Sequence, residues 1–171
     1  MRLYLAHGAS GTAASMRPFV DGLRARSIEA DAIDLPRRRA EDAVPAFVAA
    51  VPAGPELAIG GHSYGGRVAS LVAAAGLLRV RALVCFSYPL HPPGRVDAWD
   101  PRTAHWPSIR CPVILLSGES DPFARLDLMR RAVERLPAAR LITYPRLGHT
   151  LKPVLDDALD RVAAFLQAVP T

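Results

Sequence analysis

The sequence has few of the residues that mark secreted, metal-bound or membrane proteins. Its 171 residues include only two cysteines, Cys85 and Cys111, which have no metal-site spacing and form no evident disulfide framework. No apolar run approaches the roughly 20 residues of a membrane span, and the apolar stretch at residues 3–6 is too short for a signal peptide. We therefore expect no metal, no membrane span and a cytoplasmic location.

Lysine is almost absent as well. Lys152 is the only one, so arginine supplies every other basic side chain behind the formal net charge of +5. A basic balance suggests nucleic acid or acidic partners, but a nucleic-acid-binding face gathers its basic residues and interleaves them with aromatics. The arginines here are scattered, apart from the run Arg37-Arg38-Arg39. We expect no nucleic-acid partner.

The most informative stretch runs from Gly60 to Gly66. It reads GGHSYGG and holds the pattern G-x-S-x-G around Ser63. An apolar, strand-like segment at residues 57–59 precedes it, and a helix-like segment at 67–75, stopped by Gly76, follows. Strand, sharp turn and helix form the context of a nucleophile elbow, which exposes a serine hydroxyl at the top of a sheet. The alternative is a glycine-rich turn with an incidental serine.

Apolar and amphipathic segments alternate along the chain. Strands are expected at residues 3–6, 28–35, 57–59, 80–86, 112–117 and 140–144, and helices at 15–26, 43–51, 67–75, 122–136 and 153–169. This alternation predicts an α/β fold, a three-layer α/β/α sandwich with a mainly parallel sheet of about six strands. Residues 1–171 are expected to form one domain. The proline-rich residues 87–110 are predicted to be a long irregular excursion over the site.

Two further loops follow strands at the same sheet edge as Ser63. Asp121 lies after the fifth expected strand and His149 after the sixth. A serine hydroxyl is a poor nucleophile near neutral pH, so it needs a base within hydrogen-bond reach, and the base needs an orienting acid. The order Ser63, Asp121, His149 is that of α/β-hydrolases. It predicts that His149 takes the proton and that Asp121 fixes its tautomer.

Each of these assignments has an alternative. Asp121 could instead cap a helix that begins at Pro122, and Glu119 is a fallback acid. His62, adjacent to Ser63, is expected to point away from it. The remaining histidines fit the role of the base less well. His7 is expected to shape the first loop, and His91 and His105 lie on the excursion.

Attack on a carbonyl also needs preorganised donors for the charge that develops. The backbone N–H of Tyr64 follows the nucleophile at a helix N-terminus, where the dipole favours negative charge. The N–H of Ala9, in the glycine-rich loop after the first strand, is expected to be the second donor. An ordinary glycine-rich turn is the alternative for that loop.

The pocket is expected between the elbow, the first loop and the excursion. Candidate wall residues are Met16, Tyr64, Tyr88, Leu90, Trp99 and Trp106. For the two tryptophans, anchoring the excursion to the body is the favoured interpretation. Residues 37–39 could rim the site and attract an anionic substrate, but a solvated loop is favoured for them.

Five stretches together resemble a known family: His7–Gly11, Gly61–Gly66, Ser87–Gly94, Gly118–Phe123 and Gly148–His149. The chain resembles α/β-hydrolase-fold serine hydrolases over nearly its whole length. It is most similar to the small, lidless branch related to dienelactone hydrolases and to testis-expressed-protein-thirty-like hydrolases, because residues 87–94 read SYPLHPPG. The resemblance implies Ser63 as nucleophile, Asp121 as acid and His149 as base.

Two departures from that family shape the expectations. Dienelactone hydrolases use a cysteine nucleophile, whereas this chain has Ser63, so dienelactone substrates are not implied. The superfamily's first two strands have no counterpart, which implies a minimal sheet ordered 4-3-5-6-7-8 in the family's strand numbering. No inserted cap is expected, so the site should be shallow and open, suited to small or extended esters.

The sequence thus predicts an esterase-type serine hydrolase. It would cleave a carboxylic ester, or a related thioester or amide, through an acyl-enzyme, with a small-molecule ester-like substrate and no cofactor. Two alternatives stay open. One is a non-catalytic binding or scaffold protein on a hydrolase fold. The other is acyl transfer or cofactor-free perhydrolysis on the same triad.

Overall fold

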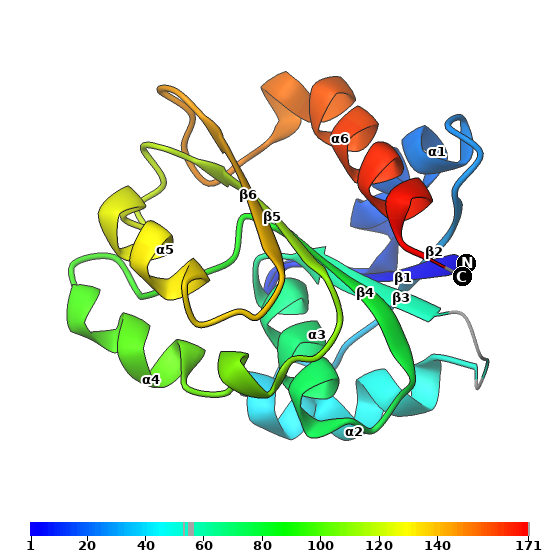
Figure 1. The fold of residues 1–171 in the computed structure, drawn as a ribbon, viewed down its shortest axis with the longest axis horizontal. Coiled ribbons are helices and arrows are strands. Elements are labelled where there is room, and N and C mark those ends of the chain that lie inside the picture. Colours follow the sequence, from blue (N-terminus) through cyan, green and yellow to red (C-terminus); the bar gives the residue numbers. More distant parts are fainter. Residues whose placement is uncertain (53, 55–56, 171) are drawn as a thin grey trace.

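The computed structural model describes residues 1–52, 54 and 57–170 and contains one six-stranded parallel sheet (Figure 1). The strands are β1 (Arg2–Ala6), β2 (Glu29–Ile33), β3 (Leu57–His62), β4 (Val80–Phe86), β5 (Val113–Gly118) and β6 (Ala139–Tyr144). All six lie where the sequence predicts strands. The expected domain, 1–171, includes Ala53, Pro55, Glu56 and Thr171, which lie outside the described residues.

The sheet order is β2-β1-β3-β4-β5-β6, which is the order that the family resemblance implies. β3 therefore lies inside the sheet between β1 and β4, and its carboxyl end carries Ser63. The interior strand β5 is buried along its whole length, whereas the edge strands β2 and β6 are partly exposed. A parallel strand covered on both faces reads as a continuous apolar run, as residues 113–116 do.

Helices cover both faces of the sheet and confirm the three-layer architecture (Figure 1). One face is covered by α1 (Arg17–Arg24) and α6 (Leu155–Ala168), and the other by α2 (Ala40–Ala50), α3 (Tyr64–Ala75) and α5 (Leu126–Val133). Successive side chains of β5 enter alternate layers, as the pleat requires. Ile114 packs with the α1–α6 layer, and Leu115 packs with the α2–α3 layer.

All five predicted helices begin two to four residues away from the predicted start, and for α2 and α5 the difference changes where a proline lies. α2 starts at Ala40, so Pro45 lies in its second turn rather than its first. Glu41 and Asp42 occupy the first turn, where acidic side chains are favoured by the helix dipole. α5 starts at Leu126 rather than at Pro122, and the residues before it form a turn.

The excursion at residues 87–110 contains three short helical segments. They are η2 (Val96–Ala98), α4 (Trp99–Thr103) and η3 (Trp106–Ser108). Trp106 is 1% exposed, lies in the buried cluster beneath α2, α3 and α5, and packs edge-on against Tyr88 with the ring centroids 5.0 Å apart. Arg135 of the body lies over the Trp99 ring, 4.4 Å from its centroid. Both tryptophans therefore anchor the excursion, as the favoured interpretation had it.

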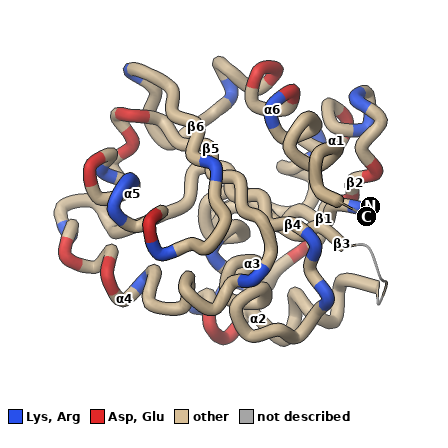
Figure 2. Tube along the Cα trace, viewed as in Figure 1, with Lys and Arg blue, Asp and Glu red and all other residues tan. Residues whose placement is uncertain are grey.

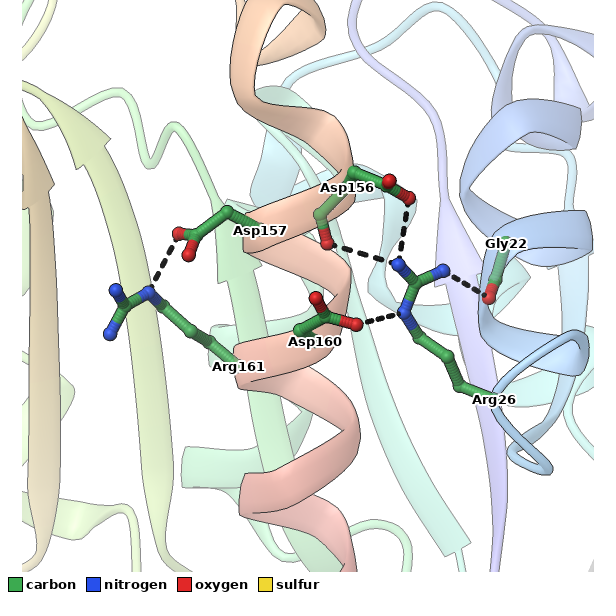
Figure 3. A network of polar contacts seen from close by, with 6 residues as sticks. All are labelled: Gly22, Arg26, Asp156, Asp157, Asp160 and Arg161. Atoms are coloured by element: carbon green, nitrogen blue, oxygen red, sulfur yellow. Dashed lines mark hydrogen bonds and ion pairs between the residues drawn. The ribbon is translucent and has the colours of Figure 1, made fainter.

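Short 3₁₀ segments lead into the two helices of the other face, η1 (Ala13–Met16) before α1 and η4 (Lys152–Val154) before α6. Arg26, just beyond α1, braces the pair (Figure 3): it donates to the Asp156 carboxylate at 2.7 Å, to Asp160 at 2.6 Å and to the Gly22 carbonyl at 2.9 Å. Arg26 therefore connects α1 to α6 on this face of the sheet.

Charged residues of both signs are interspersed along the outer helices and loops (Figure 2). In the ranges that the structure describes, none of the helices is of the length and apolar character that spanning a bilayer requires.

Candidate active site

Ser63 joins β3 to α3 in a strained backbone conformation. Its φ of 50° and ψ of −115° lie outside the regions that residues with a side chain normally occupy. Such strain persists only where surrounding contacts hold it. The Ser63 N–H donates to the Phe86 carbonyl at 2.8 Å, and the Ser63 carbonyl accepts from the Arg67 N–H at 3.1 Å. The elbow predicted from the sequence has this strand–turn–helix form.

The tight turn depends on two of its glycines. A Cβ at Gly61 would come within 2.5 Å of the Ala6 carbonyl oxygen on the neighbouring strand. A Cβ at Gly65 would collide with the carbonyls of both Ala6 and His7. At both positions the added Cβ would clash with backbone atoms, so no side-chain movement could relieve the clash. The spacing of G-x-S-x-G therefore reflects how closely α3 passes over β1.

A chain of hydrogen bonds connects Ser63, His149 and Asp121. His149 Nε2 lies 2.8 Å from Ser63 Oγ, and His149 Nδ1 lies 2.8 Å from Asp121 Oδ2. The Asp121 side chain has no exposed surface, and its other oxygen accepts the Phe123 N–H at 2.8 Å. A carboxylate can only accept, so Nδ1 of the imidazole carries the proton and Nε2 accepts from the serine hydroxyl.

The sequence leaves two other interpretations of this loop open, that Asp121 caps a helix and that Glu119 is the acid. The geometry matches neither. Asp121 does not cap α5, which begins at Leu126. The carboxylate of Glu119 accepts from the Thr143 hydroxyl at 2.8 Å, and the acid that contacts His149 is Asp121.

Two rings pack beside His149. The Phe123 ring lies 4.5 Å from it between centroids, and the His62 ring lies 5.5 Å away. His62 borders the same cavity as Ser63 and His149, and the expectation that it points away from Ser63 stays a prediction. The sharp turn at Ser63 leaves the last residue of β3 facing that cavity. Burial, and then the neighbouring His149, lowers the pKa of His62.

The remaining histidines hold the scaffold together. His7 is 2% exposed and accepts the Leu35 N–H at 3.0 Å, so it shapes the loop after β1 as expected. His91 accepts the Arg125 N–H at 3.1 Å, which ties the excursion to the start of α5. His105 Nε2 is hydrogen-bonded to Ser70 Oγ of α3, 2.8 Å away.

Ser63 borders two cavities, which share Ala9, Ser63 and Phe123. The first has a volume of about 490 Å³ and is also bordered by His149 and by residues at the start of α1. The second has a volume of about 620 Å³ and lies among α2, α3 and the excursion. The two cavities thus extend from Ser63 toward opposite helix layers.

The predicted pocket residues separate into two groups. Met16 borders the first cavity and Tyr64 the second. Tyr88 and Leu90 border neither of the two, and the expectation that they form pocket walls needs correction. They are 1% and 0% exposed, and the Tyr88 hydroxyl donates to the Arg102 carbonyl at 3.0 Å. Within the excursion, these two side chains point into the core, whereas Pro89, Pro92 and Arg95 border the second cavity.

The two predicted oxyanion donors border the cavities that Ser63 borders. Ala9 borders both cavities together with Ser63. Tyr64 is the first residue of α3, so its N–H has no partner within the helix.

Among the residues of the second cavity that sequence reasoning missed are three arginines, Arg67, Arg95 and Arg102. They line it together with Arg38 and Arg39, for which a solvated loop was the favoured interpretation. Arg67 could have been found, because it lies one helical turn after Ser63. The other two come from the excursion, whose path no local pattern indicates.

Other reactive groups play no visible part in this site. Burial raises the pKa of both thiols, that of Cys111 to about 11, so neither resembles an activated thiolate. In the described part of the chain, no group of three or more histidine, cysteine, aspartate or glutamate side chains could hold a metal ion.

Comparison with known proteins agrees with the fold. A model of the alpha/beta hydrolase domain family matches residues 1–168, so the chain belongs to that family. A search of curated proteins gave no match. Placement in the small, lidless branch stays a prediction.

Solved structures share the architecture at low sequence identity. A monoacylglycerol lipase from Paleococcus ferrophilus superposes with a TM-score of 0.82 at 14% identity, covering 99% of this chain and 95% of the lipase. The esterase Pf2001 from Pyrococcus furiosus gives 0.78 at 16% identity, with 97% and 80% covered. Est1E from Butyrivibrio proteoclasticus, solved with ferulic acid bound, gives 0.77 at 15% identity, with 98% and 88% covered.

Proposed function

We propose that this protein is a serine hydrolase that cleaves a carboxylic ester, or a related thioester or amide, through an acyl-enzyme. The observation that carries the proposal is the hydrogen-bonded chain from Ser63 Oγ through the His149 ring to the buried Asp121 carboxylate. A nucleophile, a base and an orienting acid in hydrogen-bond contact are what acyl transfer by serine requires.

In the first half-reaction, Ser63 Oγ attacks the substrate carbonyl while His149 Nε2 accepts the hydroxyl proton. The N–H groups of Ala9 and Tyr64 would stabilise the oxyanion of the tetrahedral intermediate. The imidazolium then gives its proton to the leaving oxygen, sulfur or nitrogen as the bond to the acyl carbon breaks. Asp121 holds the ring orientation and stabilises its positive charge during these steps.

In the second half-reaction, water takes the place of the leaving group. His149 accepts a proton from the water as its oxygen attacks the acyl carbon. The bond to Ser63 Oγ breaks, the serine recovers its proton from the imidazolium, and the carboxylic acid is released. The site opens to solvent through both cavities, so water and small substrates have access to Ser63.

The direct test is covalent labelling with a fluorophosphonate probe. Ser63 should displace fluoride and gain the mass of the phosphonyl group on intact-protein mass spectrometry, and Ser63→Ala should gain none. Ser108→Ala is the matched control, because this serine is exposed and borders neither cavity. A folded protein that refuses the probe would contradict the proposal and favour the binding or scaffold role.

Turnover of a neutral ester panel of varied acyl length would complete the test. Hydrolysis that requires water alone supports the hydrolase. A product that forms only when an alcohol, amine or peroxide acceptor is added would favour acyl transfer or perhydrolysis instead.

A further inference from the structure

The second cavity beside Ser63 is strongly basic. Among the described residues, five arginines and one glutamate border it: Arg38, Arg39, Arg67, Arg95, Arg102 and Glu41. They come from three separate parts of the chain, the loop before α2, helix α3 and the excursion. Only the fold brings these charges to one place, next to the candidate nucleophile.

The single carboxylate leaves most of this charge uncompensated. Glu41 pairs with Arg67 and lies 3.9 Å from Arg39. In the described ranges, no carboxylate lies within ion-pair distance of Arg38, Arg95 or Arg102. A cluster of unpaired cations repels itself, and an anion that enters the cavity removes that repulsion.

Two of these arginines are held in place by the protein. Arg102 is half-buried and donates to the Pro89 carbonyl at 3.0 Å, and burial, followed by the charge of Arg67, lowers its pKa. The Arg67 side chain is only 15% exposed, and its Nε is buried without a hydrogen-bond partner. Guanidinium groups that are positioned and partly desolvated bind carboxylates more strongly than mobile surface arginines do.

The position of His149 decides which part of a substrate meets the arginines. His149 borders the first cavity and not the second. As the acid, it must stand next to the leaving group, which therefore departs through the first cavity. The acyl chain is left to extend from Ser63 into the second cavity, past Tyr64 toward Arg67 and Arg102.

We propose that the second cavity binds an anionic group at the far end of the acyl chain, so that the preferred substrates are monoesters of dicarboxylic acids. This inference rests on the proposed hydrolase function for the direction of the acyl chain. The remote carboxylate takes no part in bond making. It positions the ester carbonyl at Ser63 by pairing with the guanidinium groups.

The test compares 4-nitrophenyl monoesters of adipic, pimelic and suberic acids, whose remote carboxylate is free, with the matching 4-nitrophenyl methyl diesters, whose remote carboxyl group is neutral. Chains of this length limit attack of the free carboxylate on its own ester. At low ionic strength, we expect kcat/KM to favour the anionic ester by about ten- to a hundredfold at the best length, the range of a charge-assisted hydrogen bond. Added salt should reduce the preference.

Arginine variants then locate the binding group. Arg95→Gln and Arg102→Gln should each reduce the anionic-to-neutral ratio of kcat/KM about tenfold. Arg95 is exposed and has no ion-pair partner in the described ranges, so Arg95→Gln keeps the test valid if Arg102→Gln fails to fold. Arg37→Gln is the matched control, because Arg37 neighbours Arg38 and is exposed but does not border the cavity. It removes the same charge and should leave the ratio unchanged.

A binding measurement separates this proposal from the proposed function. Calorimetry on Ser63→Ala should detect monomethyl adipate but not dimethyl adipate, and adding Arg102→Gln or Arg95→Gln should weaken that binding about tenfold. If Ser63 takes the fluorophosphonate but anionic and neutral esters react equally, the anion site is refuted and the hydrolase stands. If no ester is hydrolysed but monomethyl adipate binds, the hydrolase function is refuted and the anion site stands. Equal binding of both adipates would overturn the anion site whatever the catalysis.

Discussion

Replacing Asp121 by asparagine is the sharpest test of the site, because it changes one charge and almost no volume. The carboxylate has two acceptor oxygens, one 2.8 Å from His149 Nδ1 and one 2.8 Å from the Phe123 N–H. An amide offers one acceptor and one donor. If its oxygen stays with Phe123, its NH₂ faces Nδ1 and forces the proton of the imidazole to Nε2. If it turns around, its NH₂ faces the Phe123 N–H, and two donors meet.

The first arrangement stops catalysis through the tautomer. With the proton on Nε2, the ring donates to Ser63 Oγ and cannot accept its proton. The imidazolium also loses the negative charge that stabilises it. We expect kcat/KM for a neutral activated ester to fall about 10³- to 10⁴-fold, which corresponds to ~4–5.5 kcal/mol of transition-state stabilisation.

The assay is steady-state hydrolysis of 4-nitrophenyl butyrate by the wild type, Asp121→Asn and a matched control. Glu119→Gln is that control, because its carboxylate bonds to Thr143 and not to His149. It should stay within about threefold of the wild type, because this half-buried side chain does not contact His149. Retention of a tenth or more of the activity by Asp121→Asn, together with a large loss in Glu119→Gln, would refute the assignment and make Glu119 the acid.

Three other predictions concern the scaffold. Gly65→Ala should lower the free energy of unfolding in urea by about 1–3 kcal/mol or prevent folding, since its Cβ meets the Ala6 carbonyl; wild-type stability would contradict the close approach. His105, bonded to Ser70 Oγ at 2.8 Å, has its pKa lowered by burial, and then by a nearby arginine, to about 4 from 6.5. Stability should therefore fall as pH drops from about 6.5 toward 4, and His105→Gln should flatten that part of a urea-midpoint profile. Arg26→Gln should lower Tm by removing the brace in Figure 3, and an unchanged Tm would show that the brace is not stabilising.

The sequence alone was enough to predict the layers, the strands and the order of the site residues. These features have local causes. The apolar run at residues 80–86 coincides with β4 because a strand buried on both faces must be apolar throughout. The glycines around Ser63 mark the elbow because a Cβ there cannot fit. The parallel topology then brings Ser63, Asp121 and His149 to one sheet edge.

Local signals were less reliable at helix starts. Asp121-Pro122 has the composition of a helix cap followed by a first turn, yet α5 begins at Leu126. The aspartate side chain instead bonds to the Phe123 N–H and to His149, so it closes a turn and contacts the base at once. An aspartate that accepts a nearby backbone N–H can cap a helix or close a turn, and the local sequence does not show which of the two will form.

Only the tertiary structure decided what surrounds the nucleophile. Tyr88 was expected in the pocket wall and lies in the core, because its side chain points inward from the excursion. Arg102 carries no pattern in the sequence and yet borders the same cavity as Ser63 and Arg38. Strands and glycine turns are specified by neighbouring residues, whereas a cavity wall is formed by segments that meet only when distant parts of the chain pack together. The order and the meeting of Ser63, Asp121 and His149 could therefore be predicted from the sequence, and the charge around them could not.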